Sequence, residues 1–209
     1  MLNRRTFSST LLLPALTVGI TQAHAATVGQ AAPDFTATDA LGKTRKLSDF
    51  KGKHVVLEWT NPGCPFVVKH YTGGSGGNMQ SLQTDFTAKG VVWLSINSTE
   101  KESRDYLAPA MLMAWKAEKK ASASAMLMDE SGKIGQLYSA KTTPHMYIIN
   151  PKGVLVYAGA IDSVPSARAE DIKTATNYIR QGLNEALSGK AISVSSTRAY
   201  GCSVKYKDA

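Results

Sequence analysis

Short apolar runs alternate with segments of helical periodicity along the chain, and this alternation constrains the fold more than any other feature. Residues 55–59, 91–96 and 125–128 are short and apolar, as expected of strands buried on both faces of a sheet. Three helices are predicted around them: one that begins at Cys64-Pro65, one in which Met79, Leu82 and Phe86 share a face, and one over residues 102–120, which Pro109 should start or kink. Strands that alternate with helices predict a parallel sheet covered on both faces.

Hairpins and a last helix complete the predicted elements. The expected strands are residues 35–38 and 44–47 around Leu41-Gly42, and residues 146–150 and 154–159 around Pro151-Lys152-Gly153. An apolar stripe from Ile172 to Leu187 predicts one long final helix. The predicted fold class is an α/β three-layer sandwich, with a mixed central sheet and helices on both faces.

The first 25 residues have the features of an export leader. Arg4 and Arg5 precede an apolar run over residues 11–20, and Ala23-His24-Ala25 follows, which is the order of a cleavable signal peptide. The run is shorter than the roughly 20 residues of a membrane-spanning helix. Paired arginines favour a twin-arginine signal, with a Sec signal or an uncleaved anchor as alternatives. We predict a signal peptide over 1–25, a domain over 26–190 and a tail over 191–209, in a periplasmic or secreted protein that is free of the membrane after cleavage.

The composition excludes several classes of protein. Hydrophobic residues make up 43% of the chain and charged residues 19%, as in a globular domain rather than a disordered one. Without Arg4 and Arg5, 22 basic and 16 acidic side chains give the mature chain a net charge of +6. The basic residues are scattered and do not interleave with aromatic ones, so no nucleic-acid partner is predicted. Two cysteines are too few for a disulfide scaffold, but in an oxidising compartment they can pair or cycle.

Cys64 is the main candidate for chemistry, because it stands where a predicted buried strand gives way to a helix. Pro65 suits the first helical position, where its missing N–H costs nothing. The partial positive charge of a helix N-terminus stabilises a thiolate and lowers the pKa of the thiol. Ligand sites of open α/β sheets also lie at the carboxyl ends of strands. A reactive thiol is therefore predicted at Cys64, with an inert buried cysteine as the alternative.

Several motifs follow one another in a specific order. They are Ala32-Pro33-Asp34-Phe35, Leu47-Ser48-Asp49-Phe50-Lys51-Gly52-Lys53, residues 55–59, Asn61-Pro62-Gly63-Cys64-Pro65-Phe66 and Thr142-Thr143-Pro144. From about Val28 to Ala160 the chain resembles the alkyl hydroperoxide reductase/thiol-specific antioxidant (redoxin) family, in its peroxiredoxin-like branch. The resemblance implies a thioredoxin-like fold with Cys64 as the nucleophile. It also implies that Pro144 is cis beside Cys64, and that the backbone of Thr143 pairs with an extended substrate.

The chain departs from this family at two motifs. Position 61 is Asn, so the Cys-x-x-Cys pair of thioredoxins is absent. The Pro-x-x-x-Thr-x-x-Cys motif of peroxiredoxins is absent too, because Leu57 and Asn61 stand at its Pro and Thr positions. Thr60, one residue away, is the candidate to replace the peroxide-binding threonine. The expected substrate is a peroxide or a protein disulfide, with an unidentified thiol as electron donor and no cofactor.

Cys202 and Glu58 are the candidates to assist Cys64. Cys202, in the tail, could resolve a sulfenic acid or mixed disulfide on Cys64, could form a static disulfide with it, or could lie out of reach. Glu58 interrupts an apolar run six residues before Cys64. If Glu58 is buried, its pKa rises and it can shuttle protons to the thiol, whereas on the outer face it would pair with a lysine.

His145 offers a further role and a competing function. It follows Pro144, so it could lower the pKa of Cys64 as an imidazolium, or be a loop histidine without a role. Cys64, His145 and Cys202 could instead bind Cu(I), in a copper-binding or chaperone protein without turnover. The main prediction is an exported thiol-based oxidoreductase without a resident metal. Its predicted site residues are Cys64, Cys202, Glu58, Thr60, Thr143, Pro144 and His145.

Overall fold

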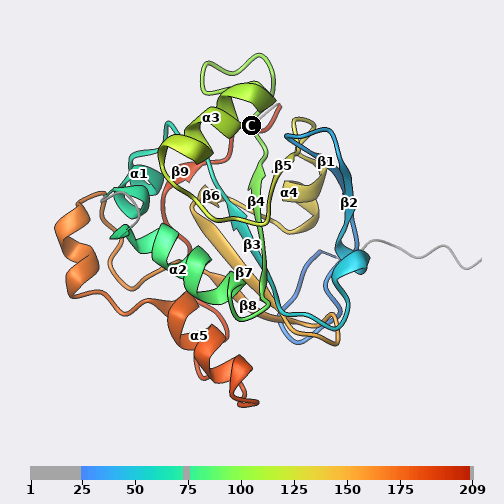
Figure 1. The fold of residues 1–209 in the computed structure, drawn as a ribbon, viewed down its shortest axis with the longest axis vertical. Coiled ribbons are helices and arrows are strands. Elements are labelled where there is room, and N and C mark those ends of the chain that lie inside the picture. Colours follow the sequence, from blue (N-terminus) through green and yellow to red (C-terminus); the bar gives the residue numbers. More distant parts are fainter. Residues whose placement is uncertain (1–24, 73–75, 208–209) are drawn as a thin grey trace, which may run out of the picture.

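The central sheet has seven strands in the order β2-β1-β5-β4-β3-β7-β8 (Figure 1). The structure is a computed structural model that describes residues 25–72 and 76–207. All of the predicted signal peptide except Ala25 therefore lies outside the described residues, as do Gly73, Gly74 and Ser75. Helices cover both faces of a mixed sheet, so the predicted fold class is confirmed.

Parallel pairing is confined to the middle of this sheet. The strand bounds are β1 Thr36–Asp39, β2 Thr44–Lys46, β3 Val55–Trp59, β4 Val92–Asn97, β5 Ala125–Met128, β7 His145–Ile149 and β8 Leu155–Gly159. Strands β3, β4 and β5 are parallel, as their alternation with helices predicts. The two predicted hairpins supply antiparallel strands at either edge. A separate two-stranded sheet, which was not predicted, joins β6 Thr142–Thr143 to β9 Cys202–Ser203.

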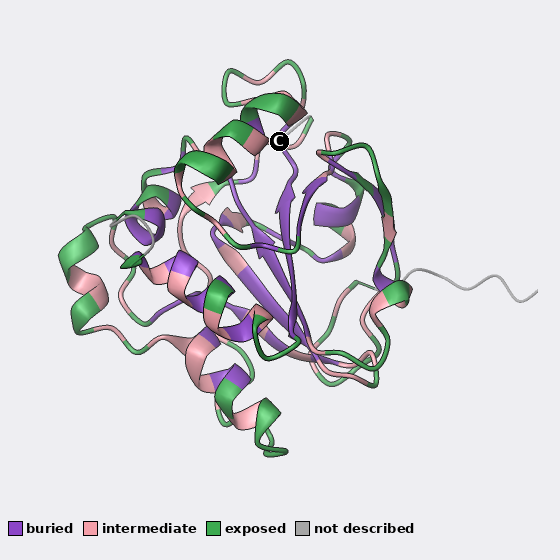
Figure 2. Cartoon of the chain, viewed as in Figure 1, coloured by how far each residue is buried: buried purple, intermediate pink, exposed green. Residues whose placement is uncertain are grey.

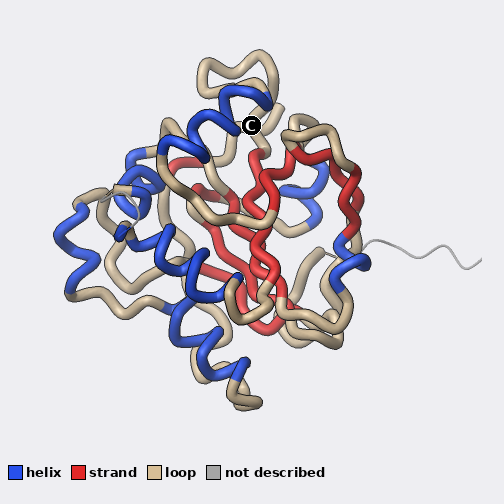
Figure 3. Tube along the Cα trace, viewed as in Figure 1, coloured by secondary structure: helices blue, strands red, loops and turns tan. Residues whose placement is uncertain are grey.

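The helices are distributed unequally over the two faces (Figure 3). Their bounds are α1 Pro65–Tyr71, α2 Asn78–Thr87, α3 Pro109–Glu118, α4 Lys133–Leu137 and α5 Tyr178–Leu187, with 3-10 helices at Leu47–Phe50 and Ala169–Lys173. Residues of α1, α2 and α5 share one apolar cluster with Val56 of β3, whereas α4 packs in a second cluster with Leu57 and Trp59. Successive β3 residues thus point to opposite faces, and the strands lie buried between the layers (Figure 2). None of the described helices is both long and apolar enough to cross a membrane.

Two helices are shorter than their sequence patterns, one at a predicted start and one at a start that was not predicted. Of the pattern over residues 102–120, the helix begins at Pro109, one of the two effects predicted for this proline, because the residue before a proline avoids the helical region and Ala108 is extended (ψ 155°). The expected helix from Ile172 to Leu187 begins only at Tyr178. The side chain of Asn177 caps it by accepting the backbone N–H of Arg180 at 2.9 Å. A propensity pattern does not reveal the start at Asn177, and helix α4 was not predicted at all.

Candidate functional site

Cys64 lies at the junction of β3 and α1, where the sequence places it. It is the N-cap residue of α1, with extended backbone angles, and Pro65 occupies the first turn. The turn is held by Asn61, whose side chain accepts the N–H of Gly63 at 2.8 Å and donates to the Thr99 hydroxyl at 3.0 Å. The Cys64 backbone N–H donates to the Asn61 carbonyl at 3.0 Å. Because these bonds fix the turn, the thiol has a defined direction.

The tail brings the second thiol to the first. Strand β9 pairs antiparallel with β6, and Cys202 is opposite Thr143. The two sulfur atoms lie 2.6 Å apart, as two free thiols. The Cys64 thiol also donates to the Thr143 carbonyl at 3.1 Å, and the Thr143–Pro144 peptide bond is cis. Both cysteines therefore meet at the Thr-Pro bend, and the alternative in which the tail does not reach Cys64 is wrong.

The surroundings of the two thiols separate their pKa values. Burial alone would raise the pKa of Cys64, but hydrogen bonds with Cys202, with Thr143 and with backbone N–H groups outweigh it, so that the pKa falls below its ordinary value. The contact between Cys64 and Thr143 is to the backbone carbonyl, and the buried Thr143 hydroxyl has no hydrogen-bond partner among the described residues. Burial, and then the hydrogen bond and charge of Cys64, raise the pKa of Cys202 to about 12. Of the two thiols, Cys64 is therefore the one that ionises at the lower pH, and Cys202 stays protonated when it does.

A small cleft of about 50 Å³ gives access to this pair. It is lined by Asn61, Gly63, Cys64, Asp105, Thr143, Cys202, Ser203 and Lys205. Cys64 itself is only 3% exposed, whereas Cys202 is half-buried. The tail therefore covers the predicted nucleophile. Asp105 and Lys205, which lie 3.7 Å apart at the cleft, were not among the predicted site residues, because only the tertiary fold brings them to Cys64.

Glu58 is completely buried, so the predicted outward-facing alternative is wrong. Burial raises its pKa, against the effect of its hydrogen-bond donors. Four side chains donate to its carboxylate over distances of 2.7–3.1 Å: Tyr71, Gln83, Trp93 and Ser95. None of these donors is a cysteine. Glu58 is connected to the site through Tyr71, which lies at the end of α1, the helix that Cys64 caps.

His145 and Thr60 do not join the two thiols. Burial first, and then the charge of Lys141, lower the pKa of His145 to about 4, so the predicted imidazolium is not present at neutral pH. The ring lies against that of Tyr147, with centroids 4.6 Å apart, and Nδ1 accepts the Lys141 N–H at 3.3 Å. Thr60 is 1% exposed and does not line the cleft. Its hydroxyl has no hydrogen-bond partner in the described part of the chain.

The donor set does not favour the copper alternative. Within residues 25–72 and 76–207, no three or more His, Cys, Asp or Glu side chains converge as they would around a metal ion. Cys64 and Cys202 meet, but His145 does not converge with them on a common point. Two sulfur atoms therefore remain without the predicted third ligand.

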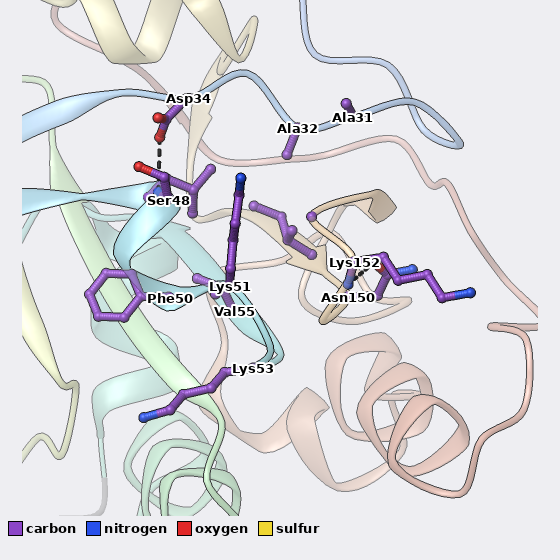
Figure 4. Close-up of a pocket in the computed structure, with 13 residues that line it drawn as sticks. Ala31, Ala32, Asp34, Ser48, Phe50, Lys51, Lys53, Val55, Asn150 and Lys152 are labelled. Carbon is purple, nitrogen blue, oxygen red and sulfur yellow. Dashed lines mark hydrogen bonds between the residues drawn. The ribbon is translucent and has the colours of Figure 1, made fainter.

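A larger cleft lies at the opposite end of β3 and contains neither cysteine. Its volume is about 280 Å³, and Val55, the first residue of β3, contributes to its wall. Figure 4 shows Lys53 and Lys152 directed away from each other at its sides, with Lys51 between the walls. The view marks hydrogen bonds from the Ser48 N–H to the Asp34 carboxylate at 2.9 Å and from the Lys152 N–H to the Asn150 side chain at 3.0 Å. Both bonds hold backbone N–H groups at the wall of the cleft, and no thiol lines it.

The comparisons with known proteins agree with this geometry. Residues 28–158 match the AhpC/TSA family. Thiol-disulfide oxidoreductase ResA of Geobacillus kaustophilus strain HTA426 is 26% identical over 133 residues, which cover 64% of this chain and 69% of that protein. An uncharacterised conserved protein of Geobacillus kaustophilus aligns with a TM-score of 0.71 at 27% identity, over 88% of this chain and 94% of that one.

Two further solved structures show the fold. A hypothetical protein of Sinorhizobium meliloti 1021 aligns with a TM-score of 0.73 at 21% identity, over 89% of this chain and 98% of that one. The thioredoxin domain of a thiol-disulfide oxidoreductase of Bacteroides vulgatus aligns with a TM-score of 0.50 at 21% identity, over 71% and 96% of the two chains. The predicted thioredoxin-like fold is confirmed. Because the family match spans more than half of the chain and includes both Cys64 and the Thr143–Pro144 bend, the protein belongs to the AhpC/TSA family.

Proposed function

We propose that the protein is an exported thiol-disulfide oxidoreductase in which Cys64 attacks the substrate and Cys202 resolves the product. One observation carries the proposal: two thiols 138 positions apart in the sequence meet at 2.6 Å beside the Thr143–Pro144 bend. Their opposite pKa shifts assign the roles, because the thiolate is the attacking species. The likeness to thiol-disulfide oxidoreductase ResA supports the same reaction class.

The reaction has two exchange steps. In the first, the Cys64 thiolate attacks a substrate disulfide, a bond forms between Cys64 and one substrate sulfur, and the other leaves as a thiolate. In the second, Cys202 gives up its proton to the departing thiolate or to water and attacks Cys64. This step releases the reduced substrate and leaves a Cys64–Cys202 disulfide. An external thiol then reduces that disulfide, and the cycle can also run in reverse to oxidise a substrate.

Access of an extended substrate depends on the tail. Strand β9 occupies the edge of β6 where the family resemblance places an extended substrate. Cys64 is 3% exposed and the cleft beside it holds about 50 Å³. A protein disulfide therefore reaches Cys64 only when β9 separates from β6. After the first exchange the tail returns, bringing Cys202 to the mixed disulfide.

Disulfide exchange is better supported than peroxide reduction. Asn61, at the position of the peroxidase threonine, is occupied in holding the turn. Thr60, its predicted substitute, lies outside the cleft. A peroxide could still oxidise Cys64 to a sulfenic acid, which Cys202 would convert to a disulfide and water. The experiment below includes this reaction as a separate arm.

Trapping of the first intermediate tests the proposal. Cys202→Ser incubated with a peptide disulfide is expected to accumulate a mixed disulfide on Cys64, which mass spectrometry detects. Cys64→Ser is the matched control and should form none. In the parallel arm, Cys202→Ser treated with hydrogen peroxide is probed with dimedone for sulfenic acid. Formation of sulfenic acid without any mixed disulfide would mean that the protein is a peroxidase and not an exchange enzyme. If neither product forms, the role of Cys64 as the nucleophile is refuted.

Export is supported by the leader over residues 1–25, with Arg4 and Arg5 before an apolar run and Ala23-His24-Ala25 at the cleavage site. An oxidising compartment also suits a cycling pair of thiols. Mass analysis of the protein expressed in a bacterial host with both export routes should give a mature chain that begins at Ala26. Replacement of both arginines by lysine should block export by the twin-arginine route and leave Sec export intact. Retention of the full chain in the cytoplasm would contradict export.

A further inference from the structure

A buried cluster of charged and aromatic side chains joins helix α1, which Cys64 caps, to the tail segment that carries Cys202. Lys69 of α1 and Asp162, which follows β8, form a salt bridge of 3.2 Å, and both side chains are at most 1% exposed. The Tyr200 hydroxyl donates to the Asp162 carboxylate and accepts from Lys69 Nζ at 3.3 Å. His70 contributes Nε2 at 3.4 Å from the same hydroxyl. The exchange chemistry proposed above uses none of these groups.

We propose that this cluster is a positioning site that holds Cys202 against Cys64, with Tyr200 as the positioning residue. The inference rests on the proposed exchange function. Tyr200 lies two residues before Cys202 in the tail, and Lys69 lies five residues after Cys64 on α1. The cluster thus fastens the chain segment of the resolving thiol directly to the helix of the nucleophile.

Burial makes this attachment strong. A charged group removed from water is stable only while its hydrogen bonds are satisfied. The Tyr200 hydroxyl is the group by which the tail donates a hydrogen bond to the Asp162 carboxylate. The other contacts of this carboxylate come from Lys69, His70 and the N–H of Val164. Departure of Tyr200 therefore weakens a buried ion pair. The Tyr200 ring adds contacts to α1, since its centroid lies 5.9 Å from that of Phe66 and 5.5 Å from Lys69 Nζ.

Gly201 sets the position of Cys202 from the other side. Its φ is +140°, a conformation that side-chain-bearing residues rarely adopt. A Cβ at this position would lie 2.1 Å from the carbonyl oxygen of Thr143. The backbone between Tyr200 and Cys202 is therefore in close contact with the Thr143–Pro144 bend. Tyr200 and Gly201 together restrict Cys202 to the neighbourhood of the Cys64 sulfur.

The expected effect is on the second exchange step. When Cys64 carries a substrate sulfur, Cys202 has lost its contact with the Cys64 thiol. The Tyr200 anchor then keeps Cys202 close enough to attack. Loss of the hydroxyl should slow this intramolecular attack without slowing the first attack by Cys64. The variant keeps Cys202, whose hydrogen bond lowers the pKa of Cys64, and a looser tail covers Cys64 less.

The test is the reaction of the reduced mature protein with 5,5′-dithiobis(2-nitrobenzoate). The first thionitrobenzoate is released when Cys64 attacks the reagent. The second is released when Cys202 attacks the mixed disulfide on Cys64 and displaces thionitrobenzoate from it. For Tyr200→Phe, the first-order rate of the second release should fall about tenfold, as expected from the loss of one hydrogen bond to a charged group. The first release should be as fast as in the wild type, or faster. Gly201→Ala, which pushes the tail off Thr143, should slow the second release as well.

Tyr138→Phe is the matched control. It removes another buried tyrosine hydroxyl, which donates to the Pro33 carbonyl at 2.7 Å and not to the tail. A general loss of stability would affect both variants alike, whereas loss of positioning affects only Tyr200→Phe. Equal second-release rates in wild type and Tyr200→Phe would overturn the positioning role. A wild-type protein that releases only one thionitrobenzoate would instead overturn Cys202 as the resolving residue, so the two failures are distinguishable.

Discussion

Oxidation of the two cysteines should stabilise the fold by about 5 kcal/mol. A bond between Cys64 and Cys202 would close a loop across 138 positions. The loop-entropy relation gives about 5 kcal/mol for a loop of this length, because the crosslink removes conformations from the unfolded chain. The pairing of Cys202 with Thr143 already brings Cys202 to Cys64, so the native backbone need not rearrange to form the bond. By linkage, the reduction potential of the native pair should lie about 100 mV below that of the unfolded chain.

Guanidinium chloride unfolding measures this effect. The mature protein is unfolded under glutathione disulfide and under dithiothreitol, with the fluorescence of the tryptophans as the signal, and the two free energies are compared. Cys202→Ser is the control and should give the same value under both conditions. A redox-dependent difference of less than about 1 kcal/mol in the wild type would mean that no native disulfide forms, since the entropic term would then be missing.

Three further predictions concern ionisation. Cys202→Ala should raise the pH midpoint of Cys64 alkylation by iodoacetamide, because it removes the hydrogen bond that lowers the pKa of Cys64; an unchanged midpoint would contradict that cause. His145→Gln should leave this midpoint unchanged, since His145, with its pKa near 4, is already neutral. The native pKa of Glu58 is raised above its ordinary value of 4.5, so its contribution to stability is complete below that pH and is lost as the pH rises through the native pKa. Glu58→Gln should remove this loss, which amounts to about 1.4 kcal/mol per unit of pKa difference, and denaturant unfolding at pH 5 and pH 8 measures it.

The sequence predicted the elements whose signals are local. The apolar run over β3 and the Pro65 that follows Cys64 placed the nucleophile at a strand-to-helix junction, as the structure has it. Pro151-Lys152-Gly153 predicted the β7–β8 hairpin, although the strand bounds shifted by one residue. Such features depend on neighbours within a few residues, and for that reason a pattern can reveal them. The start of the last helix depended on the individual capping contact of Asn177 and was misplaced.

The roles of the site residues were decided by contacts over long sequence separations. From the sequence, Cys202 could equally meet Cys64 or miss it; β9 pairing with β6 settled this across 138 positions. Whether Glu58 faces the core depended on strand register, and whether His145 is charged depended on its burial against Tyr147. Local patterns determined where each reactive group sits along the chain. Tertiary packing alone decided which groups meet and which of them carry charge, because desolvation and hydrogen bonding arise from residues that the sequence keeps far apart.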